Sequence, residues 1–539
     1  MEARRPGNYG PRIWDDDYLQ SQASIYVGEE YSKQAAKLKE NVRMMLNDKD
    51  MRALDQLELV DNLQRLGIHY HFEAEIRRIL ENIYNLSNCE DHLYGVALQF
   101  RLLRQEGYQV PQEVFSIFMN EKGQFKEILC MNTIKGVFSL YEASYLSIED
   151  ESIMEMAQKF SIHNIKKYLK QKMDDHDENN ILVKQVSHAL EMPLHWKLQR
   201  LEARWFIDNV YEQSECFNPI LLQLAKLDFN MLQAIYLDEL KHLSRWHENI
   251  NLVEMMGFTR DRLVEIFFWN VGFAFEPNFW FCRKWIVNLG EFITVIDDIY
   301  ELHGTLEELV LFTDMVDRLI LTISLSRSAH SIRSKYISLK IMKKINWSRK
   351  LIYMVMKCKE LCKTYLVDAK WYYEYDNKYT PSFKEFLNHG WVSIGGRFVI
   401  KLFYICTMNL IKKDDLELLE QNPPLIQWPS LIGRLEDDLG TSQDEIKRGD
   451  APKSIQFYMM ETKSSEENAR DYMKELIGQT WKKMNKEVLM DNTTSFSKDF
   501  VRIAMNFARG AQCMYQYGDW YGKPDGETKR SILFLFDKF

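Results

Sequence analysis

The amino-acid sequence predicts an all-α protein, and three observations support that fold class. The 539 residues include only 23 Gly and 12 Pro, which favours long helices over a turn-rich β architecture. Apolar residues recur at three- and four-residue steps, whereas a sustained two-residue alternation is hard to find. The content of 46% hydrophobic and 27% charged residues is typical of a globular chain, and its length allows more than one domain.

Two segments illustrate the helical pattern in chain order. The first carries Leu59, Val60, Leu63 and Leu66 and stops at Gly67, a residue type that commonly follows helix ends. The second begins at Asn218-Pro219, a favourable N-cap and first-turn pair. Its apolar face consists of Ile220, Leu224, Leu227, Met231 and Ile235. We place a domain boundary just before this start, which predicts an N-terminal helical domain over residues 1–215 and a C-terminal domain over residues 216–539.

Charge and cysteine content narrow the function classes. The 69 Lys and Arg against 78 Asp and Glu give a net charge of −9, which argues against a general nucleic-acid binder. The eight cysteines contain no Cys-x-x-Cys pair, so we expect reduced thiols rather than a disulfide framework. No apolar run approaches the roughly 18 residues of a membrane span. The chain opens with Met1-Glu2-Ala3-Arg4-Arg5-Pro6, and we expect no secretory or organellar presequence in it.

A buried helix that ends in carboxylates is predicted between Trp285 and Gly304. The segment is apolar nearly all the way round until it reaches Asp297-Asp298-Ile299-Tyr300-Glu301. Carboxylates at such a place are costly unless a cation or a solvent-filled cavity receives them. Asp297 and Glu301 are four residues apart and point the same way, with Asp298 close by. The group suits magnesium, which shares its ligand shell with substrate phosphates; a helix end with solvated acids is the alternative.

A second acidic cluster has the same kind of metal-binding residues in a more regular pattern. Asp437, Thr441 and Glu445 stand at positions i, i+4 and i+8, so one face of a helix stacks three oxygen ligands suited to a hard cation. Arg434 precedes the cluster by one turn and Lys453 follows it shortly, which provides cations for an anionic ligand. Two such clusters, both beside basic residues, predict a metal and diphosphate site.

Basic and aromatic residues complete the candidate site. Arg260-Asp261-Arg262 lies upstream of the first cluster, and its two guanidinium groups can form a fork for a diphosphate. Aromatic residues include Phe267-Phe268-Trp269, Tyr515, Tyr517, Trp520 and Tyr521. Aromatic runs usually belong to a core, but a pocket of aromatic faces also stabilises a carbocation without offering it a nucleophile.

At these motifs the sequence resembles the plant terpene synthases, specifically the angiosperm monoterpene synthase group. Asp297–Glu301 resembles the first aspartate-rich motif of that family, Asp437–Glu445 resembles its second metal motif, and Arg260–Arg262 resembles its upstream arginine motif. Arg4-Arg5, followed by eight residues and Trp14, resembles the tandem-arginine and tryptophan motif at the start of cyclising members. The resemblance covers most of the chain, and the four motifs stand in the family's order.

The resemblance implies a two-domain all-α fold, with an N-terminal α-barrel and a C-terminal class I α-helical bundle. The barrel would be catalytically silent, and the leading segment with Arg4, Arg5 and Trp14 would cap the other domain. Three Mg²⁺ or Mn²⁺ ions would be held by Asp297, Asp298, Glu301, Asp437, Thr441 and Glu445. The diphosphate would be bound by Arg260, Arg262, Arg434 and Lys453. Trp269 and Tyr517 would line the pocket, with Tyr517 or Asp519 near a deprotonation step.

The implied reaction is the conversion of geranyl diphosphate to a monoterpene. The allylic C–O bond ionises as the metals neutralise the leaving group, and the cation is isomerised, cyclised in some members, and quenched. The resemblance also implies a monomer in the plastid that lacks its transit peptide, or a cytosolic protein if this is the full translated form. We expect no nucleic-acid partner and no membrane span.

Three stretches depart from the family pattern. Glu301 stands where the first motif normally ends in Asp, and Arg397 follows a Ser393–Gly396 stretch where the family has Ser-Gly-Pro after the isoleucine. The largest departure is Leu319–Lys359, with ten Lys and Arg, seven Ser and neither Asp nor Glu in 41 residues. A compensated frameshift, a mis-spliced exon or relaxed selection would each produce such a segment. The segment Leu319–Lys359 contributes a net charge of +10, so the remaining 498 residues carry a net charge of −19.

The alternatives follow from these departures. A non-catalytic or nearly inactive terpene-synthase-like protein is one, and a sesquiterpene or hemiterpene synthase is another. A chain-elongating prenyltransferase is disfavoured, because the second cluster is not another full aspartate-rich repeat. A protonation-initiated diterpene cyclase needs an Asp-x-Asp-Asp motif, which the sequence lacks.

Overall fold

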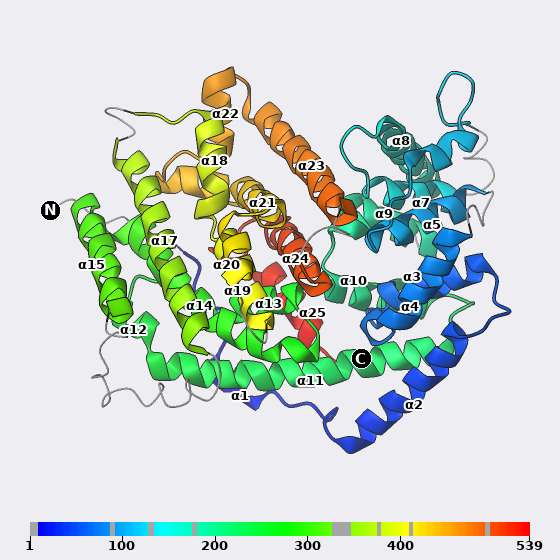
Figure 1. Cartoon of the computed structure of the whole chain (residues 1–539), viewed down its shortest axis with the longest axis horizontal. Coiled ribbons are helices and arrows are strands. Elements are labelled where there is room, and N and C mark those ends of the chain that lie inside the picture. Colours follow the sequence, from blue (N-terminus) through cyan, green and yellow to red (C-terminus); the bar gives the residue numbers. More distant parts are fainter. Residues whose placement is uncertain are drawn as a thin grey trace. The chain divides into compact units, whose positions relative to one another are not determined.

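The computed structural model describes residues 9–86, 92–127, 134–174, 180–325, 347–374, 379–408, 413–490 and 496–539. Within these ranges the regular secondary structure is helical, and the only β pairing is an isolated bridge between Met119 and Phe125. The predicted all-α fold class is confirmed (Figure 1). None of the helices in the described ranges is both long and apolar enough to cross a membrane.

Spatial contacts divide the chain into two compact units that are not continuous in sequence. Unit 1 comprises Met1–Ser21, Glu239–Thr480 and Ser497–Arg530, and unit 2 comprises Gln22–Asp238, Trp481–Phe496 and Ser531–Phe539. The first residues of the chain therefore group with its C-terminal half. The predicted division into residues 1–215 and 216–539 follows chain order and stays a prediction.

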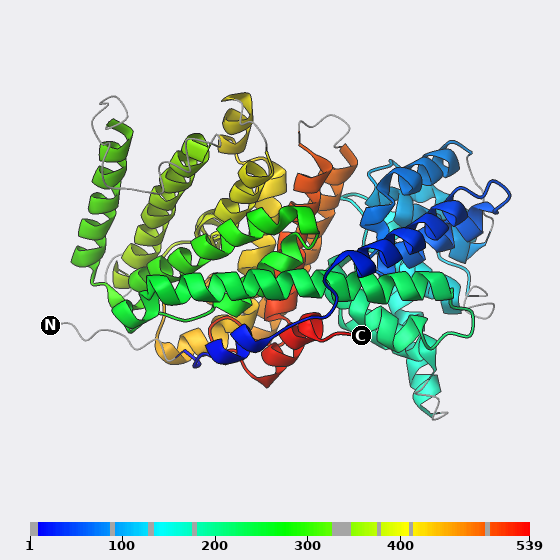
Figure 2. The same cartoon turned by 90° about the horizontal axis from the view of Figure 1, so that it is seen from below.

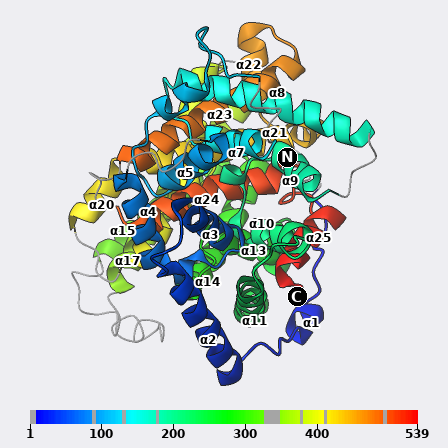
Figure 3. The same ribbon diagram turned by 90° about the vertical axis from the view of Figure 1, so that its right-hand side faces the viewer.

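Unit 2 is a set of helices whose apolar faces share one core (Figure 3). Val60 and Leu63, on the predicted helix before Gly67, are fully buried there, and Gly67 ends the helix with a φ of +70°. The helices are α2 (Glu29–Leu46), α3 (Ala53–Arg65), η1 (His69–His71), α4 (Glu73–Asn85), α5 (Leu93–Gln105), η2 (Gln112–Phe118), α7 (Ile134–Ser144), α8 (Ser152–Asp174), α9 (Ile181–Glu191), η3 (Leu194–Trp196), α10 (Gln199–Phe206) and η4 (Ile207–Tyr211).

Two long helices, α11 (Pro219–Ile250) and α23 (Glu466–Met490), each contain one of the boundaries between the units. The predicted helix start at Asn218-Pro219 is confirmed, since Asn218 Oδ1 accepts a hydrogen bond from the backbone N of Ile220 at 2.9 Å. That bond satisfies one of the free N–H groups at a helix N-terminus.

Unit 1 holds the remaining helices, and five of the helices that line its cavity pack together in Figures 1 and 2. These five are α13 (Leu263–Phe273), α14 (Trp280–Asp298), α19 (Gly396–Thr407), α21 (Pro424–Arg448) and α24 (Lys498–Tyr515). The others are α1 (Asp16–Ser21), α12 (Leu252–Met256), η5 (Pro277–Phe279), η6 (Ile299–His303), α15 (Leu306–Leu325), α17 (Trp347–Glu374), α18 (Phe383–Ser393), α20 (Lys413–Glu420), α22 (Ser454–Thr462) and α25 (Gly526–Phe536), the last of which extends beyond Arg530.

Glycines permit the close approach of these five helices. A Cβ atom on Gly510 of α24 would lie 2.7 Å from Nε1 of Trp269 on α13, and a Cβ on Gly396 of α19 would lie 2.7 Å from Cζ of Phe507 on α24. Both distances are shorter than any ordinary contact, so a larger residue would push the helices apart.

The basic segment at residues 319–359 falls partly on helices α15 and α17. Its first seven residues continue α15, and residues 347–359 begin α17, whereas residues 326–346 lie outside the described ranges. The two helices pack side by side. Asp317 of α15 forms ion pairs with Lys359 and Lys363 of α17, each at 3.1 Å. Buried Leu309 and Leu361 join an apolar cluster between the helices. The described ends of the segment are thus helical, and residues next to them pack between α15 and α17.

Candidate active site

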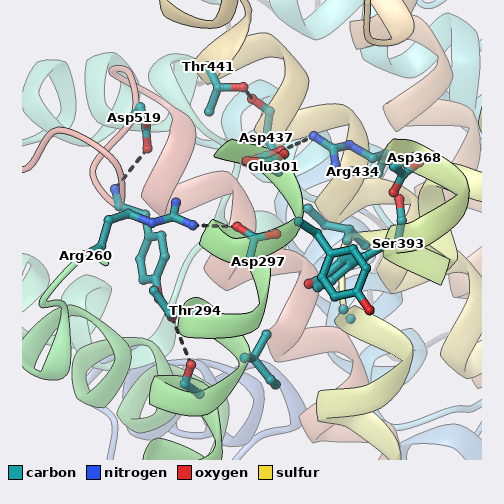
Figure 4. A pocket seen from close by; sticks show the side chains of 18 of the residues that line it. Arg260, Thr294, Asp297, Glu301, Asp368, Ser393, Arg434, Asp437, Thr441 and Asp519 are labelled. Carbon is teal, nitrogen blue, oxygen red and sulfur yellow. Dashed lines mark hydrogen bonds and ion pairs between the residues drawn. The ribbon is translucent and has the colours of Figure 1, made fainter. Parts of the chain in front are cut away.

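The cavity in unit 1 has an apolar, aromatic part and a charged part (Figure 4). Its apolar and aromatic lining comes largely from α13, α14, α17, α19, α24 and the loop after α24, and includes Ile266, Trp269, Phe273, Ile286, Ile293, Tyr365, Val399, Phe507, Tyr515 and Tyr521. Its charged lining consists of Arg260, Asp297, Glu301, Asp368, Arg434, Asp437, Glu445, Arg448, Asp450, Lys453 and Asp519. Most of the predicted site residues therefore lie around one cavity.

One wall of the charged part is formed where α14 ends. Asp297 lines the cavity in the last turn of α14, and the π-helical turn η6 that follows brings Glu301 to the same cavity. Asp297 Oδ2 accepts a hydrogen bond from Nη2 of Arg260 at 2.5 Å. Asp298 is fully buried and does not line the cavity. It accepts a hydrogen bond from the backbone N of Arg260 and pairs with its guanidinium, each at 2.8 Å. Asp298 thus holds Arg260 in place.

The opposite wall on α21 has the same design. Asp437, Thr441 and Glu445 line the cavity from one face of the helix, and Thr441 Oγ1 donates to the carbonyl of Asp437 at 2.8 Å. Arg434 forms ion pairs with both Asp437 and the fully buried Asp438. In each wall the first aspartate faces the cavity with an arginine, and the second aspartate fixes that arginine from behind. Figure 4 shows the two arginine–aspartate pairs.

Lys453 links the two walls. Its Nζ lies 3.3 Å from Oε1 of Glu301 and 4.0 Å from Oε1 of Glu445. Although burial opposes the charge, Lys453 and Arg260 hold the pKa of Glu301 down at about 2. Burial raises the pKa of Glu445 to about 8, and burial together with the charge of Glu301 raises the pKa of Asp297 to about 7. The raised pKa values of Glu445 and Asp297 indicate that the positively charged side chains of the site do not fully compensate the negative charge of its carboxylates.

These donors fit a hard divalent cation. Glu445 Oε2 is buried and has no hydrogen-bond partner in the described part of the chain, and the facing donors are carboxylate and hydroxyl oxygens, the ligands that Mg²⁺ prefers. In the described ranges no three His, Cys, Asp or Glu side chains converge on one point. A magnesium ion here would complete its shell with waters and substrate oxygens, which is its usual mode of binding.

Three predicted site residues are not brought to the cavity. Asp298 is a partner of Arg260, as described above. Arg262 is 2% exposed, and its guanidinium donates to the carbonyl oxygens of Tyr521, Gly10 and Gly522 at 2.5, 2.6 and 3.0 Å. Tyr517 is 62% exposed and is not among the lining residues. Sequence spacing alone does not distinguish these residues from Arg260, Asp297 and Tyr515, which do line the cavity.

The other predicted residues line the cavity, are buried, or fall outside the described ranges. Trp269, Lys453 and Asp519 line the cavity, and Asp519 Oδ1 accepts hydrogen bonds from the backbone N of Tyr521 at 3.1 Å and of Gly522 at 2.6 Å. Trp14 is buried, and its Nε1 donates to Oε1 of Glu265 at 3.1 Å. Arg4 and Arg5 lie outside the described residues.

The lining residues that were not predicted include Tyr9, Tyr365, Asp368 and Arg448. Tyr365 and Asp368 stand three residues apart on α17, so a helical pattern places them on one face without showing what that face meets. Arg448 is the last residue of α21, where its Nη2 pairs with Asp450 at 2.8 Å. Tyr9 lies within the eight residues between Arg5 and Trp14, and only its aromatic character could have drawn attention to it.

Comparisons with known proteins agree with this architecture. Residues 13–190 match the model "Terpene synthase, N-terminal domain", and residues 248–483 match the model "Terpene synthase family, metal binding domain". A curated relative, the chloroplastic myrcene synthase of Quercus ilex, is 48% identical over 550 residues, which cover 99% of this chain and 89% of the relative.

Solved structures with the same fold contain diphosphate ligands. Limonene synthase with 2-fluorolinalyl diphosphate superposes with a TM-score of 0.90 at 35% identity over 100% of both chains. Isoprene synthase from grey poplar leaves (Populus x canescens), in complex with three Mg²⁺ ions and dimethylallyl-S-thiolodiphosphate, superposes with a TM-score of 0.84 at 38% identity. That alignment covers 98% of this chain and 99% of the other.

Proposed function

The chain belongs to the terpene synthase family of enzymes, and from this premise we propose that it converts geranyl diphosphate to a monoterpene. The observation that carries the proposal is the pair of facing walls, each with an arginine fixed by two aspartates, beside an aromatic cavity. The metal-binding domain and the three Mg²⁺ ions of isoprene synthase support a divalent metal cofactor.

The cationic side chains bind the diphosphate in this proposal. Arg260, Arg434, Arg448 and Lys453 face the cavity and hold the phosphate oxygens through charge-assisted hydrogen bonds. Three Mg²⁺ or Mn²⁺ ions, held by Asp297 and Glu301 on one wall and by Asp437, Thr441 and Glu445 on the other, would neutralise the leaving group as a Lewis acid. The allylic C–O bond then breaks, and its electron pair leaves with the diphosphate.

The aromatic part of the cavity holds the hydrocarbon cation. The ring centroids of Phe507 and Tyr521 lie 6.2 and 6.3 Å from that of Trp269, so several π faces surround the place where positive charge develops. These rings offer no strong nucleophile and exclude water. The reaction ends when a carbon next to the cationic centre loses a proton and a C=C bond forms, with Asp519 the proposed proton acceptor at the cavity wall.

The proposal is tested with purified protein, Mg²⁺ and geranyl diphosphate, followed by gas chromatography–mass spectrometry of the volatile products. We expect monoterpene products that disappear with a chelator and in Asp297→Asn. Larger or smaller products from farnesyl or dimethylallyl diphosphate alone would favour a sesquiterpene or hemiterpene synthase. Absence of product from all three substrates would favour the nearly inactive protein that the segment at residues 319–359 suggests.

We also propose a plastid location and a monomeric state. The location is supported by the name of the chloroplastic relative from Quercus ilex. Fluorescence microscopy of the full-length gene product fused at its C-terminus tests the location, and gel filtration with light scattering tests the monomer.

A further inference from the structure

Tyr9 lies in the charged part of the cavity, although it is 288 residues or more distant in sequence from the acidic motifs that form the walls. Two guanidinium groups lie over its ring, with Cζ of Arg260 at 4.4 Å and Cζ of Arg448 at 5.5 Å from the ring centroid. Both arginines also line the cavity. The tyrosine ring thus contacts two cations of the cavity wall.

The hydroxyl group of Tyr9 is the unexplained feature. It is buried and has no hydrogen-bond partner in the described part of the chain. A buried hydroxyl without a partner is costly, so such a group calls for a ligand or a bound water. Burial raises the pKa of Tyr9 above its usual value, and the nearby Glu301 and Asp298 add to this effect, so the hydroxyl keeps its proton and can donate.

The backbone beside Tyr9 is held firmly. Gly10 donates its backbone N–H to the carbonyl of Gly522 at 3.0 Å and accepts a hydrogen bond from Arg262 at 2.6 Å. Arg12 pairs with Asp16 at 2.5 Å and with Asp261 at 3.3 Å. These contacts fix the direction in which the neighbouring Tyr9 side chain enters the cavity, and they explain why Arg262 is buried away from the cavity.

We propose that Tyr9 is a substrate-binding residue whose hydroxyl donates a hydrogen bond to the diphosphate of the substrate, while its ring contacts the guanidinium groups of Arg260 and Arg448. This inference rests on the proposed function, since it requires that a diphosphate occupies the charged part of the cavity. Arg262 is then a positioning residue, because it acts on the substrate only through the segment that carries Tyr9.

The test is the affinity for inorganic diphosphate in the presence of Mg²⁺, measured by isothermal titration calorimetry on the full chain. Tyr9→Phe removes the hydroxyl and keeps the ring. A hydrogen bond to a charged group predicts about 10- to 100-fold weaker binding. The unfolding temperature of the ligand-free protein should stay the same or rise, because the buried hydroxyl has no hydrogen-bond partner to lose in the described part of the chain. Tyr379→Phe is the matched control, because Tyr379 is exposed, lies outside the cavity and bonds Glu385 at 2.9 Å. That variant should bind as the wild type does.

A second variant separates the contribution of the Tyr9 ring to binding from that of its hydroxyl. Tyr9→Leu removes both, so we expect weaker binding than in Tyr9→Phe and a larger rise in KM than fall in kcat for geranyl diphosphate. If Tyr9→Phe binds inorganic diphosphate as tightly as the wild type, the inference is wrong and the proposed function still stands. If the wild type binds no diphosphate and forms no product, both fail together.

Discussion

Glu445 shows how a single residue can serve a ligand at the expense of stability. Its carboxylate is buried on α21, and one of its oxygens has no hydrogen-bond partner among the described residues, so without a cation the folded state bears a desolvation cost. Functional sites commonly retain groups of this kind.

We therefore expect Glu445→Gln to abolish turnover and to stabilise the metal-free protein by about 1–3 kcal/mol. Urea unfolding in a chelator and product assays with Mg²⁺ check the two effects. Glu436→Gln on the same helix is the control, because Glu436 is not among the cavity residues, and it should keep activity. Full turnover in Glu445→Gln would contradict the proposed ligand set.

A second residue-scale prediction concerns pH. Burial raises the pKa of Glu265, the partner of Trp14, to about 7, against about 4.5 in the unfolded chain. Between these values the unfolded state loses its proton while the folded state keeps it, so this group lowers stability as pH rises from about 4.5 to 7.

Glu265→Gln removes that dependence and keeps an acceptor for the indole N–H. We expect the variant to gain up to about 3 kcal/mol over the wild type by pH 7.5 and little at pH 4.5. Urea midpoints across this pH range measure the difference. A constant difference at all pH values would show that Glu265 is not the titrating group.

At the scale of elements, α19 and α24 pack so closely that the space between them leaves no room for a larger side chain at Gly396. Gly396 leaves room for Phe507, and a Cβ at Gly396 would also lie 2.8 Å from Oγ of Ser430. Gly478 in α23 has no atom within 4 Å of such a Cβ, so the two glycines form a matched pair.

We expect Gly396→Ala to destabilise the protein by about 1–3 kcal/mol through overpacking and to change the product mixture, because Gly396 and Phe507 line the cavity. Gly478→Ala should stabilise by about 0.5–1 kcal/mol through helix propensity. Thermal unfolding and product analysis of both variants provide the measurements. If Gly396→Ala and Gly478→Ala had equal effects on stability, the close contact between α19 and α24 would not be the cause of the expected destabilisation.

Sequence patterns predicted the helices better than the contacts between them. The N-cap at Asn218 and the helix end at Gly67 follow from local rules, and α21 follows from its period. The distinction between Asp297 and Asp298, by contrast, depends on which side of α14 meets Arg260. That partner comes from a loop 37 residues earlier, and no local pattern identifies it.

At the scale of the molecule, unit 1 gathers three separate stretches of chain around its cavity. The sequence predicted that the leading segment covers a distant domain only through family resemblance, because the burial of Trp14 and the entry of Tyr9 depend on long-range contacts. The charge of Leu319–Lys359 was visible in the sequence, whereas the ion pairs of Asp317 with Lys359 and Lys363 were not.

A chain that lacks residues 1–21 tests this organisation. The described part of this stretch, residues 9–21, contributes one short helix, α1, so we expect nearly unchanged helix content by circular dichroism. Affinity for inorganic diphosphate with Mg²⁺ should fall at least as far as in Tyr9→Phe, because Tyr9 and its supports are removed together. Wild-type affinity in the truncated chain would mean that this segment does not contribute to the site.

The hydrogen bond between Gly10 and Gly522 has a consequence for the order of biosynthesis. The two residues lie 512 positions apart in the sequence, so Gly10 is synthesised long before its partner exists. Helices of unit 2 that lie between them in the sequence can fold in the meantime, as early domains generally do. The wall of the cavity that carries Tyr9 is therefore tied down late, once the stretch that contains Gly522 has been made.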